Sequence, residues 1–201
     1  MNNSPPIKPP VLLLPLALSL ALMLALWVTW PHACPLPPAT PSLVELNRTN
    51  LMRLQNHWCL VGQTNPFTGV MLEFYPGGAR MSRSVISKGL LNGLSQGWFT
   101  NGQMQVQETY HDNRSDGLRT KWYPNGQKLS EATIVQGQIE GVFRHWHIDG
   151  SLAEEIPMHD GRQEGIGRAY YPSGFLAEEV EVRAGKVVTK RTWKPEDRKK
   201  L

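Results

Sequence analysis

The sequence has little or none of what catalytic and metal-binding sites commonly need. Cysteine occurs only at Cys34 and Cys59 among 201 residues, so no Cys-x-x-Cys motif is present. No Ser-His-Asp spacing and no phosphate-binding glycine loop occurs either. The two cysteines either pair in an oxidising compartment or remain unpaired thiols, with Cys59 buried beside Trp58. We therefore expect neither a catalytic site nor a bound cofactor.

Charged residues are sparse as well, at 19% of the chain, and the net charge of +4 is unevenly distributed. From Lys186 to Leu201 seven basic residues stand against two acidic ones, a net of +5, which leaves the remainder close to neutral. The remainder also lacks the interleaved Lys and Arg that contacts with a phosphate backbone require. This distribution of charge excludes nucleic acid as an expected partner.

Glycine, in contrast, is abundant and periodic. Shifting the sequence by 24 residues superposes the stretch from Gly117 to Glu140 on its neighbours on both sides. Three series of coincident positions result, in which all residues but one are glycine, and the exception is an Asn, which also tolerates positive φ. The series are Gly69, Gly93, Gly117, Gly141 and Gly165; Gly78, Gly102, Gly126, Gly150 and Gly174; and Gly89, Asn113, Gly137, Gly161 and Gly185. The chain therefore consists largely of internal repeats.

Each repeat unit predicts a β-hairpin. A short segment rich in aromatic and β-branched residues follows the first glycine, which favours a strand. The second glycine then ends a dipeptide typical of a two-residue type I′ turn, in which both central residues need positive φ. These dipeptides are Gly77-Gly78, Asn101-Gly102, Asn125-Gly126, Asp149-Gly150 and Ser173-Gly174. The second glycine of each is therefore a predicted structural turn residue.

The predicted turns set a cross-strand register that brings opposite charges together. The resulting pairs are Arg144 with Glu155, Arg168 with Glu179, and His145 with Glu154. Such pairs contribute roughly 0.2 to 1 kcal/mol each. The expected fold class is an all-β repeat: an antiparallel meander of about five hairpin units, each adding about 10 Å of sheet width.

Two adjacent aromatic residues recur in the units and predict aromatic rows on both faces of the sheet. The first members are Phe74, Trp98, Trp122, Trp146 and Tyr170, and the second members are Tyr75, Phe99, Tyr123 and Tyr171. A single sheet cannot cover both faces with its own chain, and exposed aromatic rows are common anchors for partner proteins. The partner-binding candidates are Trp98, Trp122, Trp146, Tyr123 and Tyr171. The alternative is that the rings only pack across the strands.

The pattern Gly-x4-aromatic-aromatic-x-Asn-Gly, followed by a Glu and then another Gly, resembles the MORN-repeat variant family. The late Glu is Glu131, Glu155 and Glu179, and the segment from Asn65 to Gly69 is similar to the entry of the first repeat in that family. The resemblance covers about residues 60 to 188. It implies the repeat type, whereas the expectation that the chain is not an enzyme rests on the lack of a catalytic constellation. The bacterial members of the family include YwqK-type antitoxins of toxin–antitoxin systems.

The segment before the repeats predicts attachment to a membrane. Residues 1–10 form a short N-terminal segment with one charge, Lys8, and residues 11–30 carry no charge. Twenty apolar residues suffice to cross a hydrocarbon core of about 30 Å as a helix, whereas the apolar region of a cleaved signal peptide is shorter. We expect a transmembrane anchor; a removed signal sequence, which would make the chain secreted, and a lipid attached at Cys34 are the alternatives. Lys8 favours an extracytoplasmic repeat domain, periplasmic or at the cell surface.

Three further segments and the repeats complete the predicted domain organisation. Residues 31–41 form a proline-rich linker. Residues 42–60 form a capping helix and lead-in, in which Ser42 and Glu45 have capping-box spacing, and this helix is expected to cover the leading edge of the sheet. The MORN-like repeat domain spans residues 61–188, with units starting at 69, 93, 117, 141 and 165. Residues 189–201 form a terminal strand and a basic tail.

Histidines and glutamates are the candidates for chemistry. His145 and His147 lie two residues apart on one strand face, as two metal ligands would, but no third ligand accompanies them. The late carboxylates Glu131, Glu155 and Glu179 recur in equivalent surroundings about 10 Å apart, whereas catalytic carboxylates need close neighbours in differing environments. We expect no metal site, and we expect the glutamates to serve cross-strand pairing.

These observations favour a non-enzymatic, membrane-anchored protein–protein interaction module. The resemblance implies an antitoxin or immunity-like role, in which the protein neutralises a partner protein. The alternative is a membrane-surface or lipid-binding structural protein of the cell envelope, whose basic tail touches anionic headgroups. An edge-to-edge homodimer also stays open.

Overall fold

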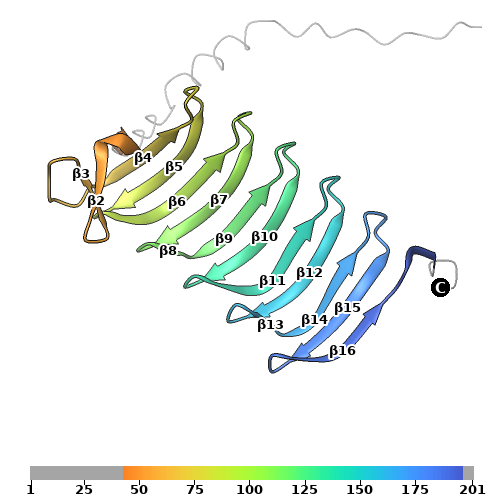
Figure 1. The fold of residues 1–201 in the computed structure, drawn as a ribbon. Coiled ribbons are helices and arrows are strands. Elements are labelled where there is room, and N and C mark those ends of the chain that lie inside the picture. Colours follow the sequence, from red (N-terminus) through yellow and green to blue (C-terminus); the bar gives the residue numbers. More distant parts are fainter. Residues whose placement is uncertain (1–42, 197–201) are drawn as a thin grey trace, which may run out of the picture. The chain divides into compact units, whose positions relative to one another are not determined.

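The computed structural model describes residues 43–196, which form one long β-sheet and a small separate hairpin (Figure 1). The predicted N-terminal segment (1–10), membrane anchor (11–30), linker (31–41) and Cys34 lie outside the described residues. Within residues 43–196, no helix combines the length and the apolar character that crossing a bilayer requires.

The strands of the sheet follow one another as an antiparallel meander, which confirms the predicted all-β fold class. From β4 to β16 they lie side by side in one row (Figure 1). The short strands β8 and β13 directly precede β9 and β14 and pair with β7 and β12. The bounds are β4 (Gly69–Phe74), β5 (Arg80–Ser87), β6 (Leu90–Trp98), β7 (Met104–His111), β8 (Arg114–Ser115), β9 (Gly117–Trp122), β10 (Lys128–Val135), β11 (Gln138–Trp146), β12 (Leu152–His159), β13 (Arg162–Gln163), β14 (Gly165–Tyr170), β15 (Leu176–Arg183) and β16 (Lys186–Thr192).

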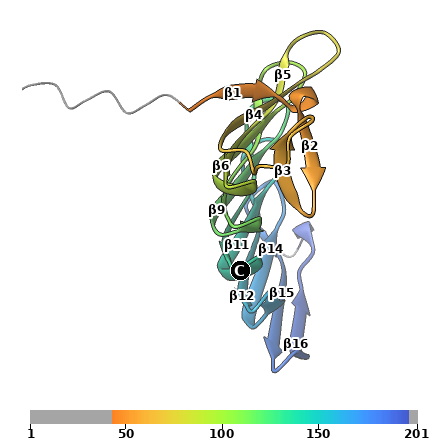
Figure 2. The same cartoon turned by 90° about the vertical axis from the view of Figure 1, so that its left-hand side faces the viewer.

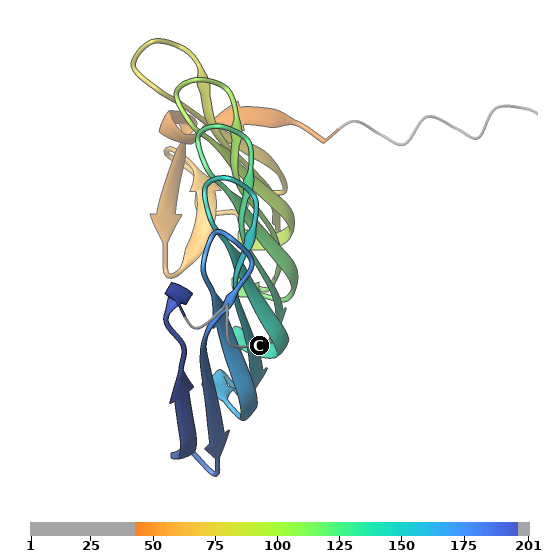
Figure 3. The same ribbon diagram turned by 90° about the vertical axis from the view of Figure 1, so that its right-hand side faces the viewer.

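The turns at the second glycine differ from the predicted type. In the third unit the chain turns through Pro124 and Asn125, and the Gly126 amide donates a hydrogen bond to the Tyr123 carbonyl oxygen (2.9 Å). Only the glycine has positive φ, at 84°. This is a type I turn followed by a left-handed glycine, with three loop residues instead of two. The other units turn in the same way, and these turns follow one another along one edge of the sheet (Figure 3). The type I′ prediction is therefore wrong here.

Type I′ turns occur at the opposite ends of the strands. Gln136 and Gly137 connect β10 to β11 with φ of 49° and 87°. Both central residues have positive φ in the equivalent turns of the other units, which are Lys88-Gly89, Asp112-Asn113, Asp160-Gly161 and Ala184-Gly185. The third glycine series therefore marks the turns that join one hairpin to the next.

The cross-strand register agrees with the prediction although the turn does not. The confirmed pairs are Arg144 with Glu155, His145 with Glu154, and Arg168 with Glu179. Beside the turn, the three-residue loop shifts the strand pairing by one position relative to a two-residue loop. An irregularity between the Trp146–Leu152 pair and the His145–Glu154 pair shifts the pairing back by one position. The predicted pairs are thus correct because two one-residue differences cancel.

The helix predicted within residues 42–60 is wrong. The segment forms β1 (Glu45–Asn47), a 3-10 turn η1 (Arg48–Asn50), β2 (Leu51–Leu54) and β3 (His57–Leu60). β1 pairs in parallel with β4, and the Val70 amide donates a hydrogen bond to the Val44 carbonyl oxygen (2.8 Å). This long-range pairing satisfies backbone groups at the edge of β4, which a helix would leave unpaired, so it overrides the local pattern. The leading edge is covered by a strand.

The β2–β3 hairpin packs against one face of the sheet. Leu51 of β2 and Phe67 contact Met71 of β4 and Ile86 of β5, and all four side chains are buried. Leu46, Trp58, Leu60 and Leu91 pack around them. Figure 2 shows the hairpin beside the first strands of the sheet. Cys59 of β3 is buried as well. We call this side of the sheet the hairpin face and the opposite side the open face.

Candidate functional site

The open face carries the first aromatic residue of each unit. Alternation along the paired strands places these residues on one face, and we call them the aromatic row: Phe74, Trp98, Trp122, Trp146 and Tyr170. Phe74 is exposed and the other four are half-buried. The Arg80 guanidinium lies 5.6 Å from the centre of the Trp98 ring, and Lys128 Nζ lies 4.9 Å from that of Trp146. The row is therefore accessible, with two rings covered in part by cations of the chain.

An aliphatic row lies on the same face, four residues before the aromatic row. Leu118, Val142 and Ile166 are 55%, 42% and 41% exposed. Their exposure means that no other part of residues 43–196 covers this surface. Polar residues of the intervening strands, such as Thr133 beside Leu118 and Glu181 beside Ile166, separate these aliphatic side chains, so the face offers apolar contacts at a regular spacing.

Between these two rows runs an alternating line of opposite charges. The line, which we call the charged row, consists of Glu131, Arg144, Glu155, Arg168, Glu179 and Arg191. Arg144 Nε lies 2.9 Å from a Glu155 oxygen, and Arg168 Nε lies 3.2 Å from a Glu179 oxygen. Glu155 and Glu179 thus have arginines on both neighbouring strands, which agrees with the predicted cross-strand pairing. Glu131 lies opposite Arg144 and Thr120, and its ion pair is with Lys128 of its own strand, at 2.8 Å.

The second aromatic of most units holds the neighbouring unit through its hydroxyl. Tyr123 donates to the Trp146 carbonyl oxygen (2.9 Å), and Tyr171 donates to that of Trp193 (3.1 Å). Tyr75 makes the equivalent hydrogen bond. Tyr123 and Tyr171 were predicted only as packing or partner-binding rings, and this hydroxyl contact was missed. Their role in partner binding stays a prediction.

The two histidines predicted on one strand face have different partners. His147 Nε2 lies 2.8 Å from the Tyr170 carbonyl oxygen and so takes the place of a tyrosine hydroxyl. A carbonyl only accepts, so the imidazole proton is on Nε2. His145 Nδ1 instead lies 3.9 Å from a Glu154 oxygen on the hairpin face. The structure does not bring these two imidazoles to one site.

A group of three potential metal ligands lies at the Asp160 turn. Oxygen and nitrogen atoms of Glu140, His159 and Asp160 lie within 4.8 Å of one another. Glu140 accepts hydrogen bonds from the His159 ring (Nδ1, 2.9 Å) and from the Asp160 amide (3.0 Å). One unit later, Glu164 accepts the equivalent bond from the Ala184 amide (3.1 Å). The group is therefore a repeated turn contact to which a histidine is added.

This contact predicts a pH dependence at the turn. The hydrogen bond with Glu140 raises the pKa of His159 above its ordinary 6.5, and the same bond lowers the pKa of Glu140 below 4.5. The His159 contribution to stability is lost as pH rises through its raised pKa, and the Glu140 contribution is lost as pH falls through its lowered pKa. We expect Glu140→Gln to move the His159 titration, followed by NMR, back toward 6.5. Glu131→Gln is the control. An unchanged His159 titration in Glu140→Gln would contradict the contact.

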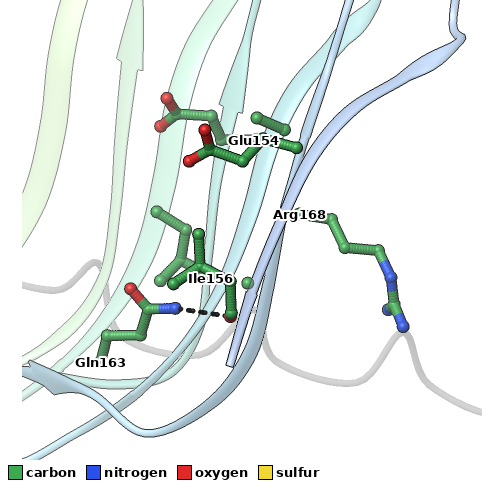
Figure 4. Close-up of a pocket in the computed structure, with 8 residues that line it drawn as sticks. Glu154, Ile156, Gln163 and Arg168 are labelled. Atoms are coloured by element: carbon green, nitrogen blue, oxygen red, sulfur yellow. Dashed lines mark hydrogen bonds between the residues drawn. The ribbon is translucent and has the colours of Figure 1, made fainter. Parts of the chain in front are cut away.

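A shallow pocket of about 110 Å³ opens on the hairpin face at Gly167 (Figure 4). Gly167 stands where the preceding unit has Phe143, and a Cβ there would lie 2.6 Å from Gln163 Nε2. Gln163 donates a hydrogen bond to a backbone carbonyl (3.2 Å), and Arg168 extends away from the pocket (Figure 4). The lining offers the carboxylates of Glu154 and Glu178, the Gln163 amide and apolar surface, without a hydroxyl, thiol or imidazole side chain.

A second polar group on the hairpin face surrounds Glu108. Its carboxylate accepts hydrogen bonds from the hydroxyls of Tyr110 (2.9 Å) and Ser115 (3.0 Å), and Arg119 lies 4.0 Å away. Burial and the bond to Glu108 raise the pKa of Tyr110 to about 12. The phenol is therefore neutral at physiological pH and serves as a hydrogen-bond donor.

Comparison with known protein families gives two matches to the family model described as MORN repeat variant, at residues 91–112 and 115–136. The matches start 24 residues apart, which is the period of the glycine series. The first contains most of β6 together with β7, and the second contains β9 and β10. These two stretches are MORN-type repeats, and the other units share their turns. No curated protein matches the chain.

Proposed function

We propose that the chain is a non-enzymatic, membrane-anchored protein–protein interaction module of the MORN-repeat type. Its binding surface consists of the aromatic and aliphatic rows of the open face, and its partner is another protein. The observation that carries the proposal is the exposure of Leu118, Val142 and Ile166 beside a row that contains three tryptophans. Tryptophan is among the residues that contribute most to binding energy at protein interfaces.

The repetition of the open face supports binding over catalysis. The second to fifth units each present an aliphatic, a polar or charged, and an aromatic side chain in the same order, about 10 Å from the next unit, whereas the first unit has Leu72 in the middle position. Catalysis needs groups whose environments differ, so that one is protonated when the other is not. Equivalent groups at a regular spacing are suited to contact an extended partner surface at several points.

The specific form of the proposal is an antitoxin or immunity-like protein at the cell envelope. The uncharged residues 11–30 support an anchor that keeps the repeats outside the cytoplasm. The antitoxin role is what the sequence resemblance implies, since bacterial members of that family include YwqK-type antitoxins. Such a protein would neutralise a partner that acts in or crosses the envelope.

The test is the partner stoichiometry of an aromatic-row variant. Full-length, C-terminally tagged protein is purified from gently solubilised native membranes, and co-purifying proteins are quantified by mass spectrometry. We expect one protein at near-equal molar amount with the native chain. We expect it to be lost with Trp122→Ala/Trp146→Ala, because truncation of central aromatic contacts removes much of the binding energy.

Val135→Ala is the matched control, because Val135 is an exposed apolar residue outside the two rows. It should retain the partner, and the tryptophan variant should melt within a few degrees of the native protein. A tryptophan variant that melts far lower would make the rings structural. Recovery of the native chain alone, or only with anionic lipid, would contradict the proposal and favour the membrane-surface alternative.

A further inference from the structure

β16 is the first strand of a sixth unit. Trp193, which follows it, stands in the position of a first aromatic, because its carbonyl accepts the Tyr171 hydroxyl as the Trp146 carbonyl accepts that of Tyr123. Among the described residues β16 pairs only with β15, whereas the first strands of the second to fifth units have neighbours on both sides. The outer edge of β16 therefore presents backbone amides and carbonyls without strand partners in residues 43–196.

The charged row ends at this edge with an arginine that has one neighbouring glutamate. Arg144 and Arg168 each lie between glutamates of two neighbouring strands. Arg191 faces only Glu179, at 3.6 Å, and 65% of its side chain is exposed. Glu179 is already hydrogen-bonded to Arg168. If the charged row continued on a strand added beside β16, the residue opposite Arg191 would carry a carboxylate.

Other residues of β16 favour the same kind of occupant. The strand contains three basic residues, Lys186, Lys190 and Arg191, and no acidic one, and of these Lys190 already pairs with Glu178 at 2.9 Å. Val187 and Val188 are 64% and 56% exposed, so an added strand would cover apolar surface. In the two preceding units the equivalent edges, of β11 and β14, are covered by β12 and β15. These two strands begin with the same sequence, Leu-Ala-Glu-Glu, at residues 152–155 and 176–179.

We propose that the outer edge of β16 binds an extended, acidic segment of a partner protein as an added strand, with a carboxylate opposite Arg191. Backbone hydrogen bonds supply the affinity, and the basic side chains select the acidic sequence. The surface is a sheet edge, so this inference goes beyond the function proposed for the open face. A second copy of β16 fits poorly, because like charges on the two strands would lie near one another.

The test uses a fluorescent peptide with the sequence of Leu176–Arg183, LAEEVEVR, which is the strand that covers the equivalent edge of β14. Titrated into the full-length protein in detergent, it should bind saturably. Arg191→Glu should weaken binding about tenfold or more, because a carboxylate then faces a carboxylate. A peptide with lysine at the position of Glu179 should restore binding to that variant. Arg114→Glu, the same charge change at an exposed position in β8, should bind like the native chain.

Hydrogen exchange locates the bound peptide. Amides of residues 186–192 should exchange more slowly when the peptide is bound. Trp122→Ala/Trp146→Ala should still bind it, so that failure of the open-face proposal and failure of this one are distinguishable. Absence of saturable binding, equal binding to Arg191→Glu, or unchanged exchange in β16 would overturn the inference. Dimerisation through β16, seen by light scattering and lost in Arg191→Glu, would assign the edge to a second copy and overturn it too.

Discussion

Replacement of Ile86 by alanine is expected to lower the free energy of unfolding by about 2 to 5 kcal/mol. Ile86 of β5 is fully buried under the β2–β3 hairpin, where it packs with Leu51, Phe67 and Met71. Truncation removes apolar contacts and leaves a cavity that a sheet with fixed backbone pairing cannot close. Urea unfolding followed by tryptophan fluorescence measures the loss, and Trp58 beside the cluster reports on it directly.

Leu118→Ala is the matched control for this change. It removes an aliphatic side chain from a strand of the same sheet, but at a position that is half exposed. We expect the free energy of unfolding to change by no more than about 0.5 kcal/mol. An Ile86→Ala variant as stable as Leu118→Ala would show that the hairpin does not pack on the sheet in solution.

The repeat architecture was predictable because it depends on local geometry that recurs. Glycine is needed wherever the backbone takes positive φ, so a 24-residue glycine period marks equivalent turns even without knowledge of the turn type. The charge alternation of Arg144, Glu155, Arg168 and Glu179 independently indicated the register. The glycine period thus located the turns, and the charge pairs indicated the register, whereas the turn type assumed from the dipeptides gave the correct register only because a bulge offset its error.

The turn types were not predictable from the dipeptides alone. Asn125-Gly126 is compatible with a type I′ turn and with a type I turn that ends on a left-handed glycine. The useful signal was Pro124, whose ring holds φ negative at the first central position of a type I turn. At the opposite edge Gln136 and Ala184 adopt positive φ, which their residue types do not suggest. A glutamate twenty residues before Ala184 accepts its amide hydrogen bond, and such a contact is visible only in the folded sheet.

Long-range contacts explain what else was missed. Leu43 to Gln55 have a helix-like pattern of apolar residues, but the edge of β4 offers Glu45 to Asn47 a parallel strand partner. The tyrosine hydroxyls reach carbonyls 22 or 23 residues away, so their role follows from the stacking of units. The exposed open face was predictable in outline, because one sheet has two faces and the chain has few residues to cover the second.

Deletion of residues 117–140 is expected to leave a folded array that is one unit shorter. Asp116 would then precede Gly141, as Glu140 does in the native chain, and β11 would take the place of β9 beside β7. Val142 and Trp146 would stay on the open face, in line with the aliphatic and aromatic rows. Because stability in such arrays is approximately a sum over units and their interfaces, cooperative melting should persist at a temperature lower by some degrees.

Deletion of residues 117–128 removes half as many residues and is expected to be more harmful. It takes out β9 and its type I turn, so the direction of every later strand is reversed relative to β4 to β7. The type I turns of the later units would then lie at the sheet edge where the earlier units have their type I′ turns. Neither the tyrosine hydrogen bonds nor the charged row could continue across the deletion site. We expect loss of the single cooperative melting transition, measured by far-UV circular dichroism and by amide protection. If the two deletions melted alike, the 24-residue hairpin would not be the folding unit of this chain.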